Sequence, residues 1–245
     1  MTEAHSKFNN VAKASLVCGL LGVLFPIVAG LGARIGVWSY MVGALLVPVG
    51  LLSALSAVIL GVVAMLRLRK VGGRLVVSAH GAGVGLLMCL YLGSQALAMQ
   101  LAPRIHNIST DIEDPPAFTL APTLRPESSN PLAYDSERIG PIQREAYPDL
   151  GPLVVSVVRN ELHGRVKRVL EEMGMTVTRD DPAAGEIEAV ATTFWFGFKD
   201  DLVVRLRAVE DGTRMDVRSV SRVGIGDVNA NANRIREVIK RVQAA

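Results

Sequence analysis

Cysteine is almost missing from this chain, which has two cysteines in 245 residues, Cys18 and Cys89. Both lie in long apolar runs, so the remainder of the chain can form neither a framework of disulfide bonds nor a thiolate metal site. A globular part outside those runs must therefore be stabilised by its own hydrophobic core. We expect no metal site and no cofactor.

Acidic residues are rare in the first part of the chain. Residues 1–101 contain seven Lys and Arg side chains but a single acid, Glu3, whereas residues 102–245 contain nineteen Lys and Arg against twenty-two acids. The first part thus lacks the string of acidic residues found in transporters. The second part lacks the positive excess that nucleic acid binding needs, so we expect no nucleic acid partner.

Three long apolar runs fill the first hundred residues, at 14–33, at about 37–66 and at 75–101. Each reaches the roughly 20 residues needed to cross a hydrocarbon core of ~30 Å. The first run exceeds the apolar region of a signal peptide and two more runs follow it, so we interpret it as a retained span. Small residues at helix-packing spacing favour a bundle of three helices: Gly19, Gly22, Ser53, Ala57, Gly81 and Gly85.

The loop between the second and third runs predicts the orientation. Residues 67–74 contain four cations, Arg67, Arg69, Lys70 and Arg74. Short loops rich in Lys and Arg stay in the cytoplasm, so we expect the N-terminus inside and everything after about residue 102 outside. This predicts a multi-pass protein of a bacterial inner (cytoplasmic) membrane, with a periplasmic C-terminal domain and the lipid bilayer as a partner.

The rest of the chain divides by its proline content. Residues 102–150 hold eight of the twelve prolines and show no sustained hydrophobic period, which indicates an extended stem. After them, hydrophobic periodicity predicts strands at 153–158, 175–179, 186–196, 201–209 and 214–222, and helices from about Asn160 to Met173 and from Asp227 or Asn229 onward. We therefore predict a three-span transmembrane α-helical anchor at 1–101, a stem at 102–150 and an extracytoplasmic α+β domain at 151–245, with an antiparallel sheet and two helices.

Asp211-Gly212 is the strongest hairpin signal in the chain. As the centre of a two-residue turn, it predicts five opposing pairs on the outer face: Val209 and Arg214, Arg207 and Asp216, Arg205 and Arg218, Val203 and Val220, and Asp201 and Arg222. The alternate residues, joined by Ile187, Ala189, Ala191 and Trp195, would form the apolar face. Like charges directly opposite each other destabilise a sheet. If the arginines of this face only pair with the protein's own acids, replacing Arg218 by a neutral residue such as Thr should leave stability unchanged or raise it by about 0.2–1 kcal/mol.

The outer face of this hairpin is the candidate ligand-binding surface. Arg is the side chain best suited to fork onto carboxylate or phosphate, and the predicted strands place aromatic rings beside the arginines. The candidate residues are Arg205, Arg207, Asp216, Arg218, Arg222 and Phe194. An anionic lipid-like ligand or an acidic protein partner would suit this surface. The alternative is an outer face whose arginines pair with the protein's own acids: Asp216, Glu188, and Asp111, Glu113 or Asp114 folding back from the stem.

The stem contains a second candidate group, His106 and Asp111, within residues 105–111. A histidine near carboxylates could ligate a metal, but no helical or hairpin spacing organises these residues. We interpret the segment as a structured linker that crosses the domain surface, and we assign no catalytic residue.

Several segments together resemble a known family. They are residues 192–205 (TTFWFGFKDDLVVR), 216–222 (DVRSVSR), 233–235 (NRI), 105–111 (IHNISTD) and 114–116 (DPP). This combination resembles a bacterial family catalogued as domain of unknown function 1499, with Asn107 where an acid is expected. The resemblance covers about residues 104–242, and the three-span anchor looks like one variant within the family. It implies no established reaction, cofactor or catalytic residue.

Three hypotheses about function follow. The first is a non-enzymatic envelope protein that binds an anionic lipid-like molecule or an acidic partner through its arginine face. The second is an enzyme acting on a phosphorylated or carboxylated envelope substrate, which requires His106 to lie near Arg205 and Arg218. The third is a structural partner of a membrane complex.

Overall fold

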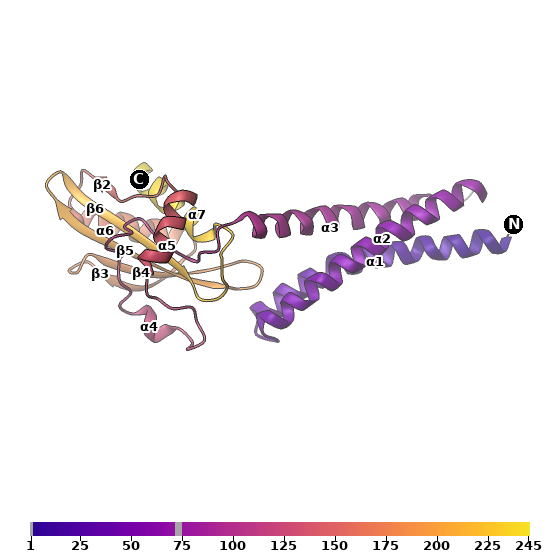
Figure 1. Cartoon of the computed structure of the whole chain (residues 1–245), viewed down its shortest axis with the longest axis horizontal. Coiled ribbons are helices and arrows are strands. Elements are labelled where there is room, and N and C mark those ends of the chain that lie inside the picture. The colour runs from indigo at the N-terminus through magenta and orange to yellow at the C-terminus, as the bar shows by residue number, and fades with distance from the viewer. Residues whose placement is uncertain (1, 72–74) are drawn as a thin grey trace. The chain divides into compact units, whose positions relative to one another are not determined.

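The chain is divided into two compact units (Figure 1). The computed structural model describes residues 2–71 and 75–245. The first unit contains the residues up to Gln100 together with Phe194–Gly197, and the second contains Leu101–Thr193 and Phe198–Ala245. The four residues Phe194–Gly197 thus belong to the first unit although they follow a strand of the second.

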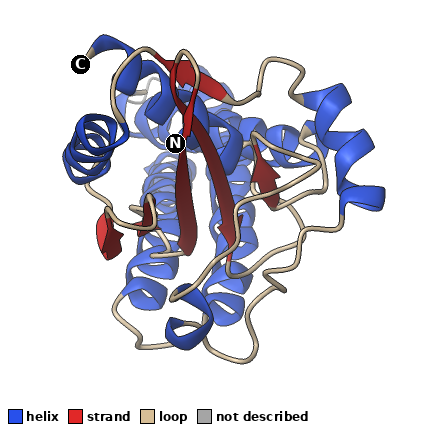
Figure 2. Ribbon diagram, turned by 90° about the vertical axis from the view of Figure 1, so that its left-hand side faces the viewer, coloured by secondary structure: helices blue, strands red, loops and turns tan. Residues whose placement is uncertain are grey.

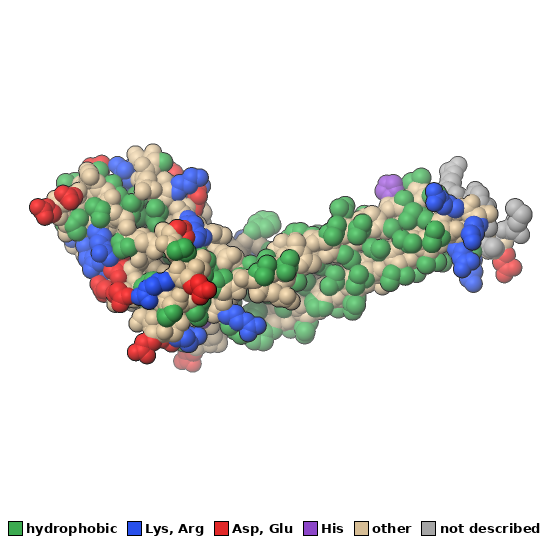
Figure 3. Space-filling view, turned by 45° about the horizontal axis from the view of Figure 1, so that its top comes forward, with side chains coloured by type: hydrophobic (Ala, Val, Ile, Leu, Met, Phe, Trp, Pro, Cys, Tyr) green, Lys and Arg blue, Asp and Glu red, His purple; other side chains and the backbone are tan. Residues whose placement is uncertain are grey.

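Three helices make up most of the first unit: α1 (Thr2–Arg34), α2 (Tyr40–Val71) and α3 (Val76–Leu101). All three are long and apolar enough to cross a membrane, which confirms the three predicted apolar helices. Their outward side chains are apolar, with Leu45 71% and Leu87 70% exposed. Figure 3 shows hydrophobic side chains over the helices and Lys and Arg gathered at one end. Of the predicted basic loop, Gly72, Gly73 and Arg74 lie outside the described residues.

Small residues bring these helices into close contact. Ser15 of α1 donates a hydrogen bond from Oγ to the Ala57 carbonyl of α2, at 2.7 Å. A Cβ added at Gly22 would lie 3.0 Å from the Cβ of Ala54, and one added at Gly81 of α3 would clash with the Ser15 side chain. The expected small faces therefore pack the three helices together.

The second unit is built on one antiparallel sheet, seen as the strands in Figure 2. Its strands are β1 (Asn107–Ser109), β2 (Leu153–Val155), β3 (Thr176–Asp181), β4 (Glu186–Thr192), β5 (Lys199–Val209) and β6 (Gly212–Ser221). The order is β1-β6-β5-β4-β3, and β2 also pairs with β6. The α+β fold class predicted for this part is confirmed.

Two amphipathic helices cover the apolar face of the sheet. They are α6 (Arg159–Glu172) and α7 (Ala230–Ala244). The core between helices and sheet contains Leu162, Val166, Val169 and Leu170 of α6, Ile235, Val238 and Val242 of α7, and Leu202, Val204, Leu206, Met215 and Val217 of the hairpin. Gly174, with φ +73°, follows α6 as predicted. Ahead of α7, the Asp227 carboxylate accepts hydrogen bonds from the backbone N–H groups of Asn229 and Asn231.

Residues 102–150 are more ordered than the predicted stem. They form β1 and two helices, α4 (Ala121–Leu124) and α5 (Ser136–Ala146). The buried Gln143 of α5 donates to the Ser109 carbonyl at 2.6 Å and accepts from the Ser109 N–H at 3.1 Å. The buried Glu188 of β4 accepts the N–H groups of Thr119, Leu120 and Ala121 at 2.5 to 2.8 Å, so it holds the start of α4. Such contacts with single distant side chains leave no periodic pattern in the sequence.

The register predicted for the β5–β6 hairpin is wrong by two residues. Val209 pairs with Gly212, so the turn is centred on Glu210 and Asp211 rather than on Asp211-Gly212. Gly212, with φ +136°, lies against β2 instead, where a Cβ would clash with the Val155 carbonyl. Because side chains alternate with a period of two, a slip of two residues keeps every side chain on its expected face. The opposing partners change, and the faces do not.

The end predicted for the preceding strand is also wrong. β4 ends at Thr192, and a tight loop follows in which the Thr193 N–H donates to the Phe198 carbonyl at 2.8 Å. Gly197 has φ +69°, a conformation that suits glycine. Phe194 and Trp195 are therefore loop residues of the first unit, so Trp195 is not part of the core beneath the sheet and Phe194 is not a strand residue beside Arg205 and Arg207.

Candidate functional site

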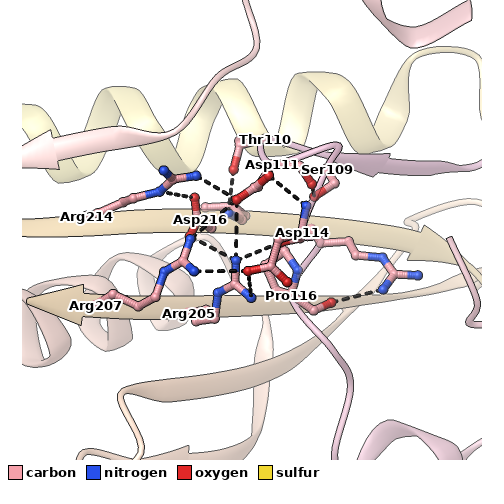
Figure 4. A network of polar contacts seen from close by, with 11 residues as sticks. Ser109, Thr110, Asp111, Asp114, Pro116, Arg205, Arg207, Arg214 and Asp216 are labelled. Carbon is pink, nitrogen blue, oxygen red and sulfur yellow. Dashed lines mark hydrogen bonds and ion pairs between the residues drawn. The ribbon is translucent and has the colours of Figure 1, made fainter. Parts of the chain in front are cut away.

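Three arginines and three aspartates meet on the outer face of the sheet, and we call this group the arginine cluster (Figure 4). Its members are Arg205 and Arg207 of β5, Arg214 and Asp216 of β6, and Asp111 and Asp114 from the segment after β1. In the observed register Arg205 lies opposite Asp216 and Arg207 opposite Arg214. The like-charge pair on this face is thus Arg207–Arg214, and the predicted pair Arg205–Arg218 is wrong.

Asp216 is the centre of the cluster. Its carboxylate is completely buried and accepts from Arg205 at 3.2 Å, from Arg207 at 2.8 Å and from Arg214 at 2.9 Å. A buried charge is tolerated only when it is paired and hydrogen-bonded. The three guanidinium groups meet that requirement. The Asp216 carboxylate that they share in turn allows Arg207 and Arg214 to lie opposite each other despite their like charges.

Asp111 and Asp114 complete the charge balance. Asp111, whose side chain is 11% exposed, lies 2.6 Å from Arg214, 3.3 Å from Arg207 and 3.5 Å from Arg205. Asp114, whose side chain is 65% exposed, lies 3.1 Å from Arg205 and 3.0 Å from Arg207. The charge of Arg205, followed by hydrogen bonds with both arginines, lowers the pKa of Asp114 below its ordinary value of 3.8. The cluster is therefore neutral, with three cations and three anions.

Local backbone contacts position the two stem acids. Thr110 continues the pairing of β1 by donating its N–H to the Val217 carbonyl at 2.9 Å, and its hydroxyl accepts the Val217 N–H at 2.8 Å. The Asp114 N–H then donates to Asp111 Oδ1 at 2.9 Å, which closes a short turn. Strand β1 and this turn together bring both carboxylates over the sheet.

Arg218 lies in a separate, buried environment. It is opposite Val203 and only 4% exposed. Its guanidinium donates to Asn107 Oδ1 at 3.0 Å, to the Pro116 carbonyl at 2.9 Å and to the Leu132 carbonyl. It also lies 5.2 Å from the ring centre of Phe118 and 5.6 Å from that of Tyr134. Burial lowers the pKa of Arg218 from 12.5 to about 10, so the group stays charged at neutral pH.

The Arg218 contacts give Asn107 a role that the sequence does not reveal. An amide at this position accepts from Arg218 and, through Nδ2, donates to the Ala133 carbonyl at 3.2 Å. A carboxylate could make only the first of these contacts.

Arg222 is also buried, and it forms the expected ion pair with Asp201, with Nη2 at 2.7 Å from Oδ1, although the residue opposite Asp201 is Val220. The same carboxylate lies 3.3 Å from Arg125, a buried arginine that no sequence pattern pointed to. Arg222 donates further to the Leu124 carbonyl at 3.1 Å. Arg222 and Arg125 therefore hold the end of α4 on the sheet.

His106 lies away from the arginine cluster. The Ser221 N–H donates to its backbone carbonyl, which places it opposite Ser221, whereas Arg205 is opposite Asp216. Five positions along β6 correspond to roughly 16 Å. The His106 ring lies 3.3 Å from the Ile225 carbonyl, after β6. The constellation that the enzyme hypothesis requires is not formed.

A family model described as "Protein of unknown function (DUF1499)" matches residues 107–242. A comparison with curated proteins found no match. The matched region begins at β1 and so includes the stem acids as well as the sheet.

Proposed function

This chain belongs to the family of proteins of unknown function DUF1499, and we propose its function from its own geometry. It is a membrane-anchored, non-enzymatic protein whose extracytoplasmic domain binds an acidic protein segment through the arginine cluster. The supporting observation is that the cluster already holds an acidic segment. Arg205 donates to the Asp114 backbone carbonyl at 2.7 Å, and Arg205 and Arg207 both contact the Asp114 carboxylate. Two guanidinium groups thus bind a carboxylate and a peptide carbonyl of the same residue.

Asp114 is the part of this arrangement that a partner could replace. Its carboxylate is largely exposed, whereas Asp111 and Asp216 are nearly or completely buried. Exposed ion pairs contribute little to stability, so exchanging Asp114 for another carboxylate costs the fold little. Arg207, with 39% of its side chain exposed, stays accessible to an incoming group.

The placement of Phe194 favours an acidic protein segment over a lipid-like ligand. An anionic lipid would need an apolar surface beside the arginines. Phe194 was expected to supply that surface, but it lies in the loop assigned to the first unit. The enzyme alternative loses its proposed base, since His106 contacts Ile225 rather than the cluster. The proposed site is therefore limited to Arg205, Arg207 and Arg214, with Arg218 and Arg222 as buried structural residues.

A peptide that copies residues 109–116 tests the binding site. It is titrated, with a fluorescent label, into the full chain in detergent while anisotropy is measured. We expect Asp114→Asn to bind the peptide several-fold more tightly than wild type, because the competing carboxylate is gone, and we expect added salt to weaken binding. Adding Arg207→Gln should remove the gain. Asp211→Asn, which removes an exposed acid at the hairpin turn, is the matched control. Equal affinity for all four proteins would refute the site.

The proposed location is the inner membrane of a bacterium, with the N-terminus inside and the second unit on the periplasmic side. Its support is the concentration of Arg67, Arg69 and Lys70 at the end of α2. Alkaline phosphatase fused after residue 245 should be active, and the same reporter fused after Lys70 should be inactive. The reverse result would overturn the orientation.

A further inference from the structure

The loop between β4 and β5 concentrates aromatic side chains in a chain that has few of them. Only 5% of all residues are aromatic, yet Phe194, Trp195, Phe196 and Phe198 fall within five positions. The loop is closed at its neck by Thr193 and Phe198, so its tip is too short to bury its own rings. Phe194 is 88% exposed, which is the highest value among the exposed large hydrophobic side chains of the described residues.

The tip of this loop belongs to the helical unit, where it contacts α1. Trp195 Nε1 donates to the Pro26 carbonyl at 2.9 Å, and the indole ring fills the space over Gly30, where a Cβ would clash with it. Arg34 Nη1 donates to the Phe194 carbonyl at 2.6 Å, and its guanidinium lies 5.8 Å from the Phe194 ring centre. The loop therefore follows α1 from its last residue inward for about two turns, or ~12 Å.

This end of α1 is where a bilayer would give way to water. No charged residue occurs between Lys13 and Arg34, and Arg34 ends the helix. The other tryptophan of the chain, Trp38, lies at the same end and donates from Nε1 to the Ala29 carbonyl at 3.1 Å. Tryptophan is enriched at membrane–water interfaces because its ring is apolar while its N–H can be hydrogen-bonded.

We propose that Phe194–Gly197 form a membrane-interface element, with Trp195 at the boundary between headgroups and acyl chains and the Phe194 ring in contact with lipid. The bilayer is the occupant that explains an almost fully exposed phenylalanine beside helices whose outward side chains are themselves apolar. Arg34, at the level of the headgroups, carries the charge that faces water or phosphate. This inference rests on membrane insertion of α1 to α3 and is independent of the arginine cluster.

Three full-length proteins with one tryptophan each test the proposal. Trp38→Phe leaves Trp195, Trp195→Phe leaves Trp38, and Trp38→Phe with Trp195→Phe and Phe194→Trp moves the reporter to position 194. Each is reconstituted into phosphatidylcholine vesicles with bromine near the headgroup or near the bilayer centre. We expect brominated lipid to quench the reporters at 194 and 195, and bromine near the headgroup to quench position 194 more than bromine near the centre does. Acrylamide in the water should quench both weakly.

The reporter at position 38 distinguishes a loop that does not contact lipid from helices that are not inserted in the membrane. If brominated lipid quenches position 38 but not 194 and 195, the helices are inserted and the interface element is refuted. Quenching at 195 without quenching at 194 also refutes it, because the exposed ring is the part that must meet lipid. If none of the three is quenched, membrane insertion itself is refuted, and this inference with it.

Discussion

Replacing Arg218 by methionine should destabilise the second unit by about 3 kcal/mol. The change removes the donor for three acceptors: the buried Asn107 Oδ1 and Pro116 carbonyl, and the partly buried Leu132 carbonyl. Each orphaned acceptor costs about 2 kcal/mol. Part of this is regained, because the pKa of Arg218, lowered by burial from 12.5 to about 10, corresponds to a charge penalty of about 3 kcal/mol. Methionine keeps the contacts with the rings of Phe118 and Tyr134.

The matched control is Arg214→Met, which removes the same charge and shape from the same strand. Arg214 is 31% exposed, and Asp216 keeps Arg205 and Arg207 as partners without it. We expect a loss of no more than about 1 kcal/mol. Arg218→Lys should fall between the two, because an ammonium keeps the charge but cannot fork onto three separated oxygens.

Urea denaturation of the full chain in detergent, read out by brief proteolysis of the unfolded fraction, measures these differences. With slopes of about 1–3 kcal/mol/M, a loss of 3 kcal/mol lowers the urea midpoint by about 1 M or more. If Arg218→Met lies within about 1 kcal/mol of Arg214→Met, the buried contacts do not stabilise the fold, and the reasoning from orphaned acceptors fails. If Arg218→Met instead stabilised the second unit, the repulsion between Arg205 and Arg218 predicted from the sequence would be supported.

Three further predictions test other parts of the structure. Glu188→Gln should destabilise the second unit by about 1–3 kcal/mol, because it removes a charged acceptor shared by three backbone N–H groups. Glu186→Gln, at a partly exposed site, is the control and should have little effect in the same urea assay. Gly81→Val should disrupt helix packing, since a Cβ there clashes with α1, whereas Gly83→Val meets open space; thermal melting of the full chain in detergent should separate the two. Burial raises the pKa of Asp227 above 3.8, so its contribution to stability is greatest below pH 3.8 and is lost as pH rises through the folded-state pKa. Asp227→Asn should remove that decline from a plot of unfolding free energy against pH.

The features that depend on a local period could be predicted from the sequence. The apolar stripes of α6 and α7 repeat every three to four residues, and the hairpin alternates every second residue, so these helices, the hairpin strands and their faces follow from the periodicity of the sequence. The assignment of Arg205, Arg207 and Asp216 to the outer face holds even though the register slipped, because the slip was a whole period.

The features that depend on one distant partner could not be predicted. Gly212 was predicted to lie at the centre of the hairpin turn, but it is the first residue after the turn. Glycine is needed there because the backbone of Val155 on β2 approaches it too closely for a Cβ, and the sequence does not show this approach. Arg218 suited an exposed face, and only the fold of residues 107–134 shows that its guanidinium is enclosed. The aromatic run at Phe194 has high strand propensity, which extended the predicted strand past the loop closed by Thr193 and Phe198.

Strand β6 has hydrogen-bonding partners along both of its sides. β5 covers one side, while β2 pairs with residues 213–215 and β1 with residues 218–220 on the other, and Thr110 bonds to Val217 between them. A shortened chain that began at residue 151 would keep β2 but lose β1 and Thr110, the other partners on that side of β6. It would leave the N–H and C=O groups of β6 from Val217 onward open to pairing with another molecule, which is a known route to aggregation. A soluble fragment of the second unit must therefore begin ahead of Asn107.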